Sequence, residues 1–321
     1  MMSGTTAELS LLRKKTRKRI TFNWELWLGG GLIVGLILFA LAGLLTGVDP
    51  NAYSKNPFAA PSAEHLLGTD NLGRDTAARL SAATRTGLFI AVIATLLAAT
   101  VGTGLALIAG YFGGVWDSLI MRFTDLFLSI PGILMALVIK VILGPGTGTL
   151  VLTMTVIFSP VFARIMRGPV LAVRERGFIV AAEVAGRSRW GIATSHILPN
   201  VMTPMLITAA GIAGETVLVE ATLSYLGQGV QAPDPSAGRM INEFQKYMTL
   251  HPLLIIIPSI LIFLQVSAWH LLADGIQNAV DGKRTPRQRR LFSSVLPGGR
   301  STIAGAELEP ALNKQSQPTA S

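Results

Sequence analysis

Residues 88–112 read LFIAVIATLLAATVGTGLALIAGYF, a stretch of 25 residues without a charged side chain. A helix that crosses the roughly 30 Å hydrocarbon core of a bilayer needs about 20 predominantly apolar residues. This stretch therefore predicts a transmembrane helix, and it places the chain among integral membrane proteins.

Five further apolar stretches lie on either side of it. They predict transmembrane helices over residues 24–46, 119–143, 149–165, 201–223 and 253–272. The first is too long for the core of a cleavable signal peptide, so it is expected to stay in the chain. The composition agrees, since 50% of the 321 residues are hydrophobic and 14% are charged, whereas soluble domains carry about 25% charged residues. The sequence predicts an all-α integral membrane protein with six transmembrane helices.

Lys and Arg residues are distributed unevenly between the segments that join these helices. The N-terminal tail, residues 164–199 and the C-terminal tail hold 19 of the 27. The loops on the other side, residues 49–85 and 227–251, hold six of them against six acids. Because cytoplasmic segments of membrane proteins are enriched in Lys and Arg, both termini are expected in the cytoplasm. The net charge of +9 is then explained by the Lys and Arg residues of the cytoplasmic segments, which orient the chain in the membrane. No binding of nucleic acid is expected.

The assignments divide the chain into five parts. These are a basic cytoplasmic tail (1–23), the first transmembrane helix (24–46), an extracytoplasmic loop (47–87), a core with five transmembrane helices and a cytoplasmic loop at 166–199 (88–283), and a disordered cytoplasmic tail (284–321). The chain has no Cys, and its four His share no metal-ligand spacing. Neither a metal site nor a cofactor is expected.

The cytoplasmic loop contains the most informative polar segment, GFIVAAEVAGRSRWGIATSHILPN at 177–200. Ala181, Ala182, Ala185 and Gly186 predict a short helix with a small-residue surface that another surface can approach closely. Glu183 and Arg187 are spaced to form an i,i+4 pair, and the Leu198–Pro199 step is expected to end the local pattern. Either a partner protein covers this helix, or it is an ordinary connector whose alanines serve helix propensity.

The spacing of this loop, from Ala181-Ala182 through Gly186 to the His-Ile-Leu-Pro-Asn of 196–200, resembles the EAA loop of importer permeases in the binding-protein-dependent ABC class. Six further motifs narrow the resemblance to the C-type subunit of the dipeptide/oligopeptide/nickel branch. They are LGTDNLGRD (67–75), AGYFGGVWD (109–117), MRFTD (121–125), LGPG (143–146), EATLSYLGQG (220–229) and ADGIQNAVD (273–281). The resemblance covers residues 64–283. Val180 stands where the family usually has the glutamate of its loop, with Glu183 one turn later.

The resemblance implies that loop 177–199 is a coupling helix docking on a cytoplasmic ABC ATPase. The residues it assigns to this loop are Ala181, Ala182, Glu183, Gly186, Arg187, His196, Leu198 and Pro199. It also implies a homologous second permease subunit, an extracytoplasmic solute-binding protein and a location in the inner membrane lipid bilayer. The chain lacks its own phosphate-binding loop, because Gly282-Lys283 is preceded by Gln277 where the motif needs glycine.

The expected function is transport rather than catalysis. The chain resembles a permease subunit that forms half of the pathway of an ATP-driven importer of di- or oligopeptides. One alternative is the same kind of permease for nickel or a metal chelate. Another, from a different class, is a proton-coupled secondary transporter that uses Glu215, Glu220 and Asp125.

Ionisable residues inside transmembrane helices are costly and therefore functional candidates. Arg122 and Asp125 are spaced to pair with each other, as a structural ion pair or as a gate. Glu215 and Glu220 are not one turn apart, so they are expected to face different neighbours, as candidates for the pathway, the subunit interface or bundle packing. Lys140 is expected to extend to the outer interface.

One extracytoplasmic cluster also has two interpretations. Asp70, Arg74 and Asp75 form either a docking site for the binding protein or a tight turn in which Asp75 caps the helix leading into the second transmembrane segment.

Overall fold

The computed structural model describes residues 23–281 of the chain. The helices, in order, are α2 (Trp24–Leu45), α3 (Thr76–Leu107), the π-helical turn η1 (Ile108–Phe112), α4 (Gly114–Leu128), α5 (Gly132–Leu143), α6 (Thr147–Arg174), α7 (Gly177–Val184), α8 (Arg189–Ile192), the π-helical turn η2 (Ala193–Ile197), α9 (Leu198–Tyr225), α10 (Ala237–Phe244), the 3₁₀ turn η3 (Gln245–Tyr247) and α11 (Leu253–Asp281). Over this range the β pairing is a single bridge between Thr69 and Asp75. The structure confirms the predicted all-α class.

The chain divides into two units, residues 1–277 and residues 278–321. Of the second unit, only the last turn of α11 is described. The predicted basic tail up to residue 22 and the predicted disordered tail at 284–321 lie outside the described residues.

Within residues 23–281, five helical segments are long and apolar enough to cross a membrane. They are α2, α3 with η1, α6, α8 through α9, and α11. The stretch predicted as one continuous span at 119–143 is instead two helices, α4 and α5, bent by 91°. Pro131, at the break, lacks a backbone N–H and disfavours a helical conformation of the residue before it. Hydropathy alone is continuous across this step, which is why the pattern predicted a single helix.

Helix α3 packs along α6 in the centre of the first unit. At Gly102 a Cβ would collide with the Ser159 carbonyl and the side chain of Phe162, and at Gly110 with Val170. The absence of side chains on these glycines allows the two helices to lie close together. Phe162 is fully buried and belongs to the main apolar cluster that joins α3, α6 and α9.

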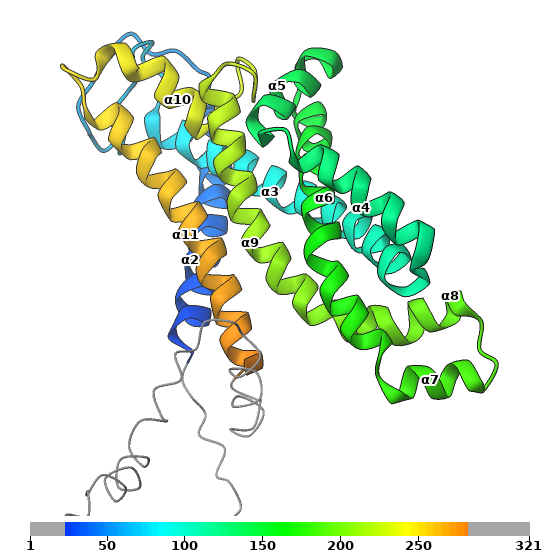
Figure 1. The fold of residues 1–321 in the computed structure, drawn as a ribbon. Coiled ribbons are helices and arrows are strands. Elements are labelled where there is room, and N and C mark those ends of the chain that lie inside the picture. Colours follow the sequence, from blue (N-terminus) through cyan, green and yellow to red (C-terminus); the bar gives the residue numbers. More distant parts are fainter. Residues whose placement is uncertain (1–22, 282–321) are drawn as a thin grey trace, which may run out of the picture. The chain divides into compact units, whose positions relative to one another are not determined.

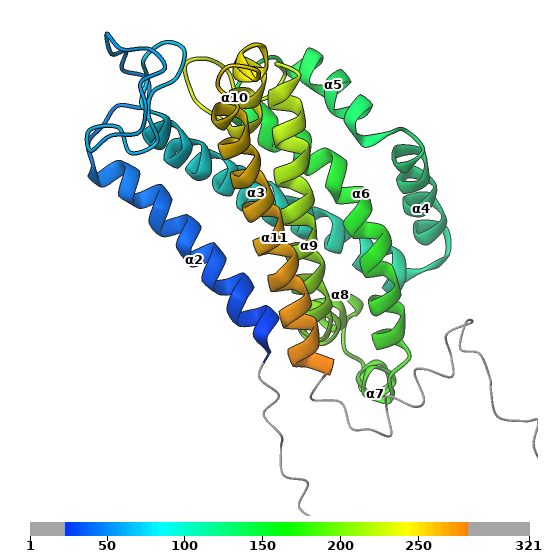
Figure 2. The same ribbon diagram turned by 90° about the vertical axis from the view of Figure 1, so that its left-hand side faces the viewer.

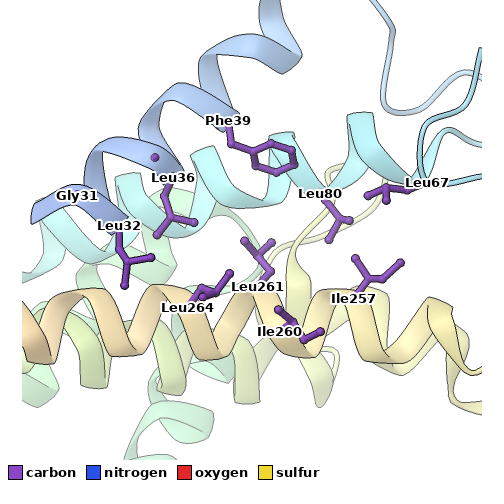
Figure 3. A pocket seen from close by; sticks show the side chains of 11 residues that line it. Gly31, Leu32, Leu36, Phe39, Leu67, Leu80, Ile257, Ile260, Leu261 and Leu264 are labelled. Atoms are coloured by element: carbon purple, nitrogen blue, oxygen red, sulfur yellow. The ribbon is translucent and has the colours of Figure 1, made fainter. Parts of the chain in front are cut away.

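Helices α2 and α11 touch near Gly29 and Gly275, where a Cβ would meet the backbone of the other helix. Away from this contact they diverge (Figure 2). Between them and α3 lies a cavity of about 370 Å³. Its lining comes from the apolar side chains and glycines in Figure 3, including Leu36, Leu80 and Leu261. The lining therefore offers no polar side chain that could hold a polar solute.

Two groups of short elements lie at opposite ends of the helical bundle. Helices α7 and α8 lie at one end, and α10 with the loop before α3 lies at the other (Figure 1). We refer to these as the α7 end and the α10 end. Helix α10 packs closely on α9, because a Cβ on Gly238 would collide with the backbone of Ala221.

Candidate functional site

Helix α7 is short because its sequence ends it abruptly. The Arg187 N–H donates to the Ala182 carbonyl at 3.2 Å, and the Gly186 N–H donates to the Glu183 carbonyl at 3.0 Å. Gly186 has φ +77°, a left-handed conformation that glycine adopts without a steric penalty. This pair of bonds is the Schellman arrangement that closes a helix. The predicted short helix is thus present with eight residues, and Ala185 and Gly186 lie just beyond its end.

The outer face of α7 is apolar and uncovered. Val184 is 85% exposed, and Phe178 and Val180 are exposed as well. Ile179 is the buried residue of this helix, and Ala182 packs partly against the main cluster. Exposed apolar patches of this kind mark interaction sites. Ala181, Ala185 and Gly186 lie on the exposed part, so the small-residue surface predicted from the sequence is accessible.

The inner side of α7 contacts the end of α3. The Tyr111 hydroxyl, on η1, donates to Glu183 Oε1 at 3.1 Å. The ring centroids of Phe112, on η1, and Trp190, on α8, lie 5.0 Å apart. Arg174, at the end of α6, also donates to the Gly110 carbonyl of η1 at 3.1 Å. Both α7 and α8 therefore contact the same π-helical turn. Interruptions of this type occur frequently at functional sites.

The predicted pair between Glu183 and Arg187 is not formed. Helix α7 ends at Val184, so Arg187 no longer lies one helical turn beyond Glu183. Arg187 donates instead to Ser195 Oγ at 3.2 Å. Since Glu183 faces Tyr111, its carboxylate links α7 to α3 rather than stabilising α7 alone.

The remaining loop residues lie where α8, η2 and α9 follow one another. His196 Nδ1 is 3.0 Å from Ser195 Oγ, and Leu198 packs against the main apolar cluster. Pro199 stands in the first turn of α9, a position where the missing N–H is tolerated. The Leu198–Pro199 step was expected to end the local pattern, but helical structure continues through it.

Two ion pairs connect α4 to α6 near the α7 end. Asp125 pairs with Arg164, and Asp117 accepts two bonds from Arg167 at 2.7 and 2.6 Å. The predicted pairing of Asp125 with Arg122 is therefore wrong. Within residues 23–281 Arg122 forms no ion pair. The i,i+3 spacing of Arg122 and Asp125 did not indicate that Arg164, on α6, would lie closer to Asp125.

The two glutamates of α9 have different environments, as predicted. Glu220 is 3% exposed and accepts a hydrogen bond from Ser224 Oγ at 2.6 Å. Glu215 is 53% exposed and lies 3.8 Å from His270 Nε2 on α11. Because Glu220, Glu215 and Asp125 each have a separate partner, the described part of the chain contains no hydrogen-bonded relay that joins them.

Lys140 is buried instead of extending to the interface. Its ammonium donates to Thr149 Oγ1 at 2.8 Å and to the Gly146 carbonyl at 3.3 Å. It therefore holds the turn between α5 and α6. Within residues 23–281, no three His, Asp or Glu side chains gather in an arrangement that could hold a metal ion.

At the α10 end, the prediction of a helix cap is confirmed. Asp75 accepts from the Ala78 N–H at 2.7 Å, and His65 Nδ1 lies 2.8 Å from its other oxygen. Asp70 accepts from Arg74 Nε at 2.6 Å. Asp70, Arg74 and Asp75 are all buried. These three side chains therefore stabilise the loop before α3 from within.

Arg74 also connects this loop to α10. Its Nη2 donates to Glu243 at 2.9 Å, and Arg79 donates to the same carboxylate at 3.0 Å. Sequence reasoning missed Arg79 and Glu243, because more than 160 residues separate the two partners and neither belongs to a local motif.

Residues 102–285 match the family described as binding-protein-dependent transport system inner membrane component. The chain belongs to this family. This permease is 38% identical to the glutathione transport system permease protein GsiD of Pectobacterium atrosepticum over 223 residues, which cover 70% of this chain and 74% of that protein. It is 36% identical to the dipeptide transport system permease protein DppC of Alkalihalophilus pseudofirmus over 254 residues, which cover 78% and 84%.

The fold is also similar to that of a solved importer. A chain of the MetNI methionine ABC transporter, in an inward-facing conformation, matches with a TM-score of 0.52 at 17% identity, over 62% of this permease and 94% of that chain. The protein is thus a multi-pass membrane permease subunit of an ABC importer, and the family resemblance found in its motifs is confirmed.

Proposed function

We propose that this permease imports di- or oligopeptides and forms half of a pathway completed by a homologous second permease subunit. The names of its relatives support this substrate class, since one is a dipeptide permease and the other a permease for glutathione, itself a small peptide. A solute-binding protein delivers the peptide, and separate ABC ATPase subunits supply the energy.

The observation that carries the proposal is the position of α7. This helix exposes Val184 and Val180 on one side and on the other holds the end of α3 through the bond from Tyr111 to Glu183. An ATPase that covers the exposed face can move α7, and the bond passes this movement to α3. Because α3 packs along α6 without intervening side chains at Gly102, a displacement of its end moves the core of the bundle.

The orientation follows from the same assignment. An ATPase acts from the cytoplasm, so the α7 end faces the cytoplasm and the α10 end faces outward. This agrees with the positive charge of the segment around α7. The start of α2 lies at the same end of the bundle as α7 (Figure 1), so it faces the cytoplasm as well.

The solute pathway, in this proposal, runs along the face that carries Glu215 and His270. Both side chains are about half exposed, and both lie well inside helices long enough to span the membrane. An ionisable group that faces lipid at this depth costs about 2.5–3.5 kcal/mol. This face is therefore turned toward the second subunit or the pathway. Arg122 and Asp125, on α4, are separate candidates for the pathway or the subunit interface.

Reconstitution tests the proposal. The permease, its sister subunit, the ATPase subunits and the binding protein are placed in vesicles, and uptake of a labelled dipeptide and of Ni²⁺ is measured. We expect dipeptide uptake that requires ATP and persists when the proton gradient is collapsed. Uptake of Ni²⁺ alone contradicts the peptide assignment, and uptake without ATP that stops with the proton gradient contradicts the importer mechanism.

A further inference from the structure

Five charged side chains form a network at the α10 end that ties the start of α3 to α10. Glu243 accepts bonds from Arg74 and Arg79 through one oxygen and from Arg239 through the other, at 2.9, 3.0 and 2.9 Å. Asp70 accepts from Arg74 at 2.6 Å. Arg74, Arg79 and Asp70 are buried, and the side chains of Arg239 and Glu243 are 22% and 20% exposed.

The charges of this network do not balance. It contains three guanidinium groups and two carboxylates. Arg79 is fully buried. Among residues 23–281 its Nε and Nη1 find no hydrogen-bond partner, and the Asp70 carboxylate lies 3.6 Å from Nε. An uncompensated buried charge is strongly destabilising. The surplus cation favours the approach of one more anion.

A cavity gives an anion access to the network. It has a volume of about 340 Å³, and its charged lining residues are Arg74, Arg239, Glu243 and Lys246. Arg239 uses Nε for Glu243, and within residues 23–281 its two terminal nitrogens have no hydrogen-bond partner. The end of a guanidinium fork binds a carboxylate through two parallel bonds. With Lys246, which adds a further positive charge, the open part of this cavity suits a single carboxylate.

We propose that this cavity receives one Asp or Glu side chain of the extracytoplasmic binding protein, held by Arg239 and Lys246. The inference rests on the proposed function, which supplies that partner and places the α10 end outside. The cavity is lined by the loop before α3, the segment before α10, α10 itself and η3 rather than by the mid-portions of the membrane-spanning helices. Its opening therefore faces a docking protein and not a solute already in transit.

This arrangement joins docking to the permease core. Glu243 is held by Arg239 on one side and by Arg74 and Arg79 on the other. A carboxylate that binds the two terminal nitrogens of Arg239 shares this guanidinium with Glu243, which keeps Nε, and it compensates the surplus charge. Docking of the binding protein therefore changes the contacts of Arg79, in the first turn of α3. The other end of this helix contacts α7.

The test measures the affinity of the binding protein for the complete importer in nanodiscs. Arg239→Gln and Lys246→Gln are compared with Lys55→Gln, an exposed lysine in the loop before α3 that does not line the cavity. We expect each of the first two variants to weaken binding about 10- to 100-fold, as for the loss of a charged hydrogen bond, and to reduce its salt dependence. Lys55→Gln should stay within about 2-fold of the wild type.

A double-mutant cycle identifies the anion. One Asp→Asn or Glu→Gln change in the binding protein should cause the same loss, and it should cause no further loss when combined with Arg239→Gln. Equal affinity of all permease variants overturns the inference while ATP-dependent peptide uptake by the wild type still supports the proposed function. An affinity that changes only with anionic lipid in the disc assigns the cavity to a lipid phosphate and also overturns it. Failure of the wild-type importer to bind any binding protein contradicts the proposed function itself.

Discussion

Asp75 illustrates how one side chain fixes the start of a membrane-spanning helix. Its carboxylate accepts the free N–H of Ala78 and lies beside His65. Replacing an N-cap by alanine costs about 1 kcal/mol. We expect Asp75→Ala to lower the apparent unfolding temperature of the purified permease, and Asp75→Asn, which keeps a capping oxygen, to lower it less. Equal unfolding temperatures for the wild type and Asp75→Ala would contradict the role of the cap.

Glu243 makes the network at the α10 end sensitive to acid. Burial raises its pKa, but the positive charges of Arg79, Arg74 and Arg239 outweigh this effect and hold the pKa below its ordinary value of 4.5. A depressed carboxyl pKa contributes stability that is complete above the ordinary value and is lost as the pH falls through the folded-state value.

The lowered pKa of Glu243 predicts how the stability of the permease depends on pH. Between pH 6 and pH 3, the apparent unfolding temperature of the wild type should fall more steeply than that of Glu243→Gln, which has no carboxylate to protonate. The exposed residue Glu64 provides the control, and Glu64→Gln should keep the slope of the wild type. Parallel curves for Glu243→Gln and the wild type would show that the arginines do not stabilise the ionised form.

The sequence predicted the contacts of some of these residues but not of others. Asp75 was recognisable because a cap and its helix are neighbours in the chain, and the different environments of Glu215 and Glu220 followed from helical spacing. The partner of Asp125 was not recognisable, because Arg164 reaches it only after α4 folds against α6. The bond from Tyr111 to Glu183 joins positions 72 residues apart, which no local pattern encodes.

Packing between elements depends on glycines that lie at the contact. Gly102 faces the backbone of α6, whereas a Cβ on Gly104, on the same helix, meets nothing within 4 Å. Overpacking a tight contact costs about 1–3 kcal/mol, and alanine is a better helix former than glycine by about 0.5–1 kcal/mol. Gly102→Ala should therefore destabilise the permease in thermal unfolding, while Gly104→Ala should be neutral or stabilising. The reverse order would contradict the packing of α3 on α6.

The link between α7 and α3 is tested by removing one hydroxyl. A hydrogen bond contributes about 0.5–1.5 kcal/mol, so Tyr111→Phe should reduce ATP-driven uptake about 2- to 10-fold without changing assembly of the complex. Tyr225→Phe removes a comparable bond to Gln245 at the opposite end of the bundle and should have little effect. Equal uptake by the two variants would mean that the Tyr111 contact does not transmit movement.

At the level of helices, the sequence predicted which segments are helical better than it predicted where a helix breaks or ends. Long apolar runs predicted the membrane-spanning elements because hydrocarbon thickness sets their length. The break between α4 and α5 depends on the backbone geometry of Pro131, and the abrupt end of α7 depends on Gly186 at φ +77°. Both signals are present in the sequence, but an average over apolar content does not detect them.

At the scale of the whole molecule, the family was recognisable from motifs in unbroken order, whereas the surfaces for partners required the fold. Helices α7 and α10 lie at opposite ends of the bundle (Figure 1). Helix α7 carries the exposed apolar face, and α10 lines the polar cavity. In our proposal one faces the ATPase and the other faces the binding protein, with α3 between them. Their separation explains how a chain without its own nucleotide site can respond to events on both sides of a membrane.

The absence of cysteine from the chain makes site-specific crosslinking the most direct test of coupling through α7. Val184→Cys places one thiol on the exposed face of α7, and Leu66→Cys, at a 72% exposed position of the loop before α3, serves as the control. In membranes that contain the complete importer, we expect a crosslink from position 184 to the ATPase subunit, with a yield that changes when ATP is added, and none from position 66. A permease whose position 184 reaches no ATPase, and which moves peptide alone, would contradict the account.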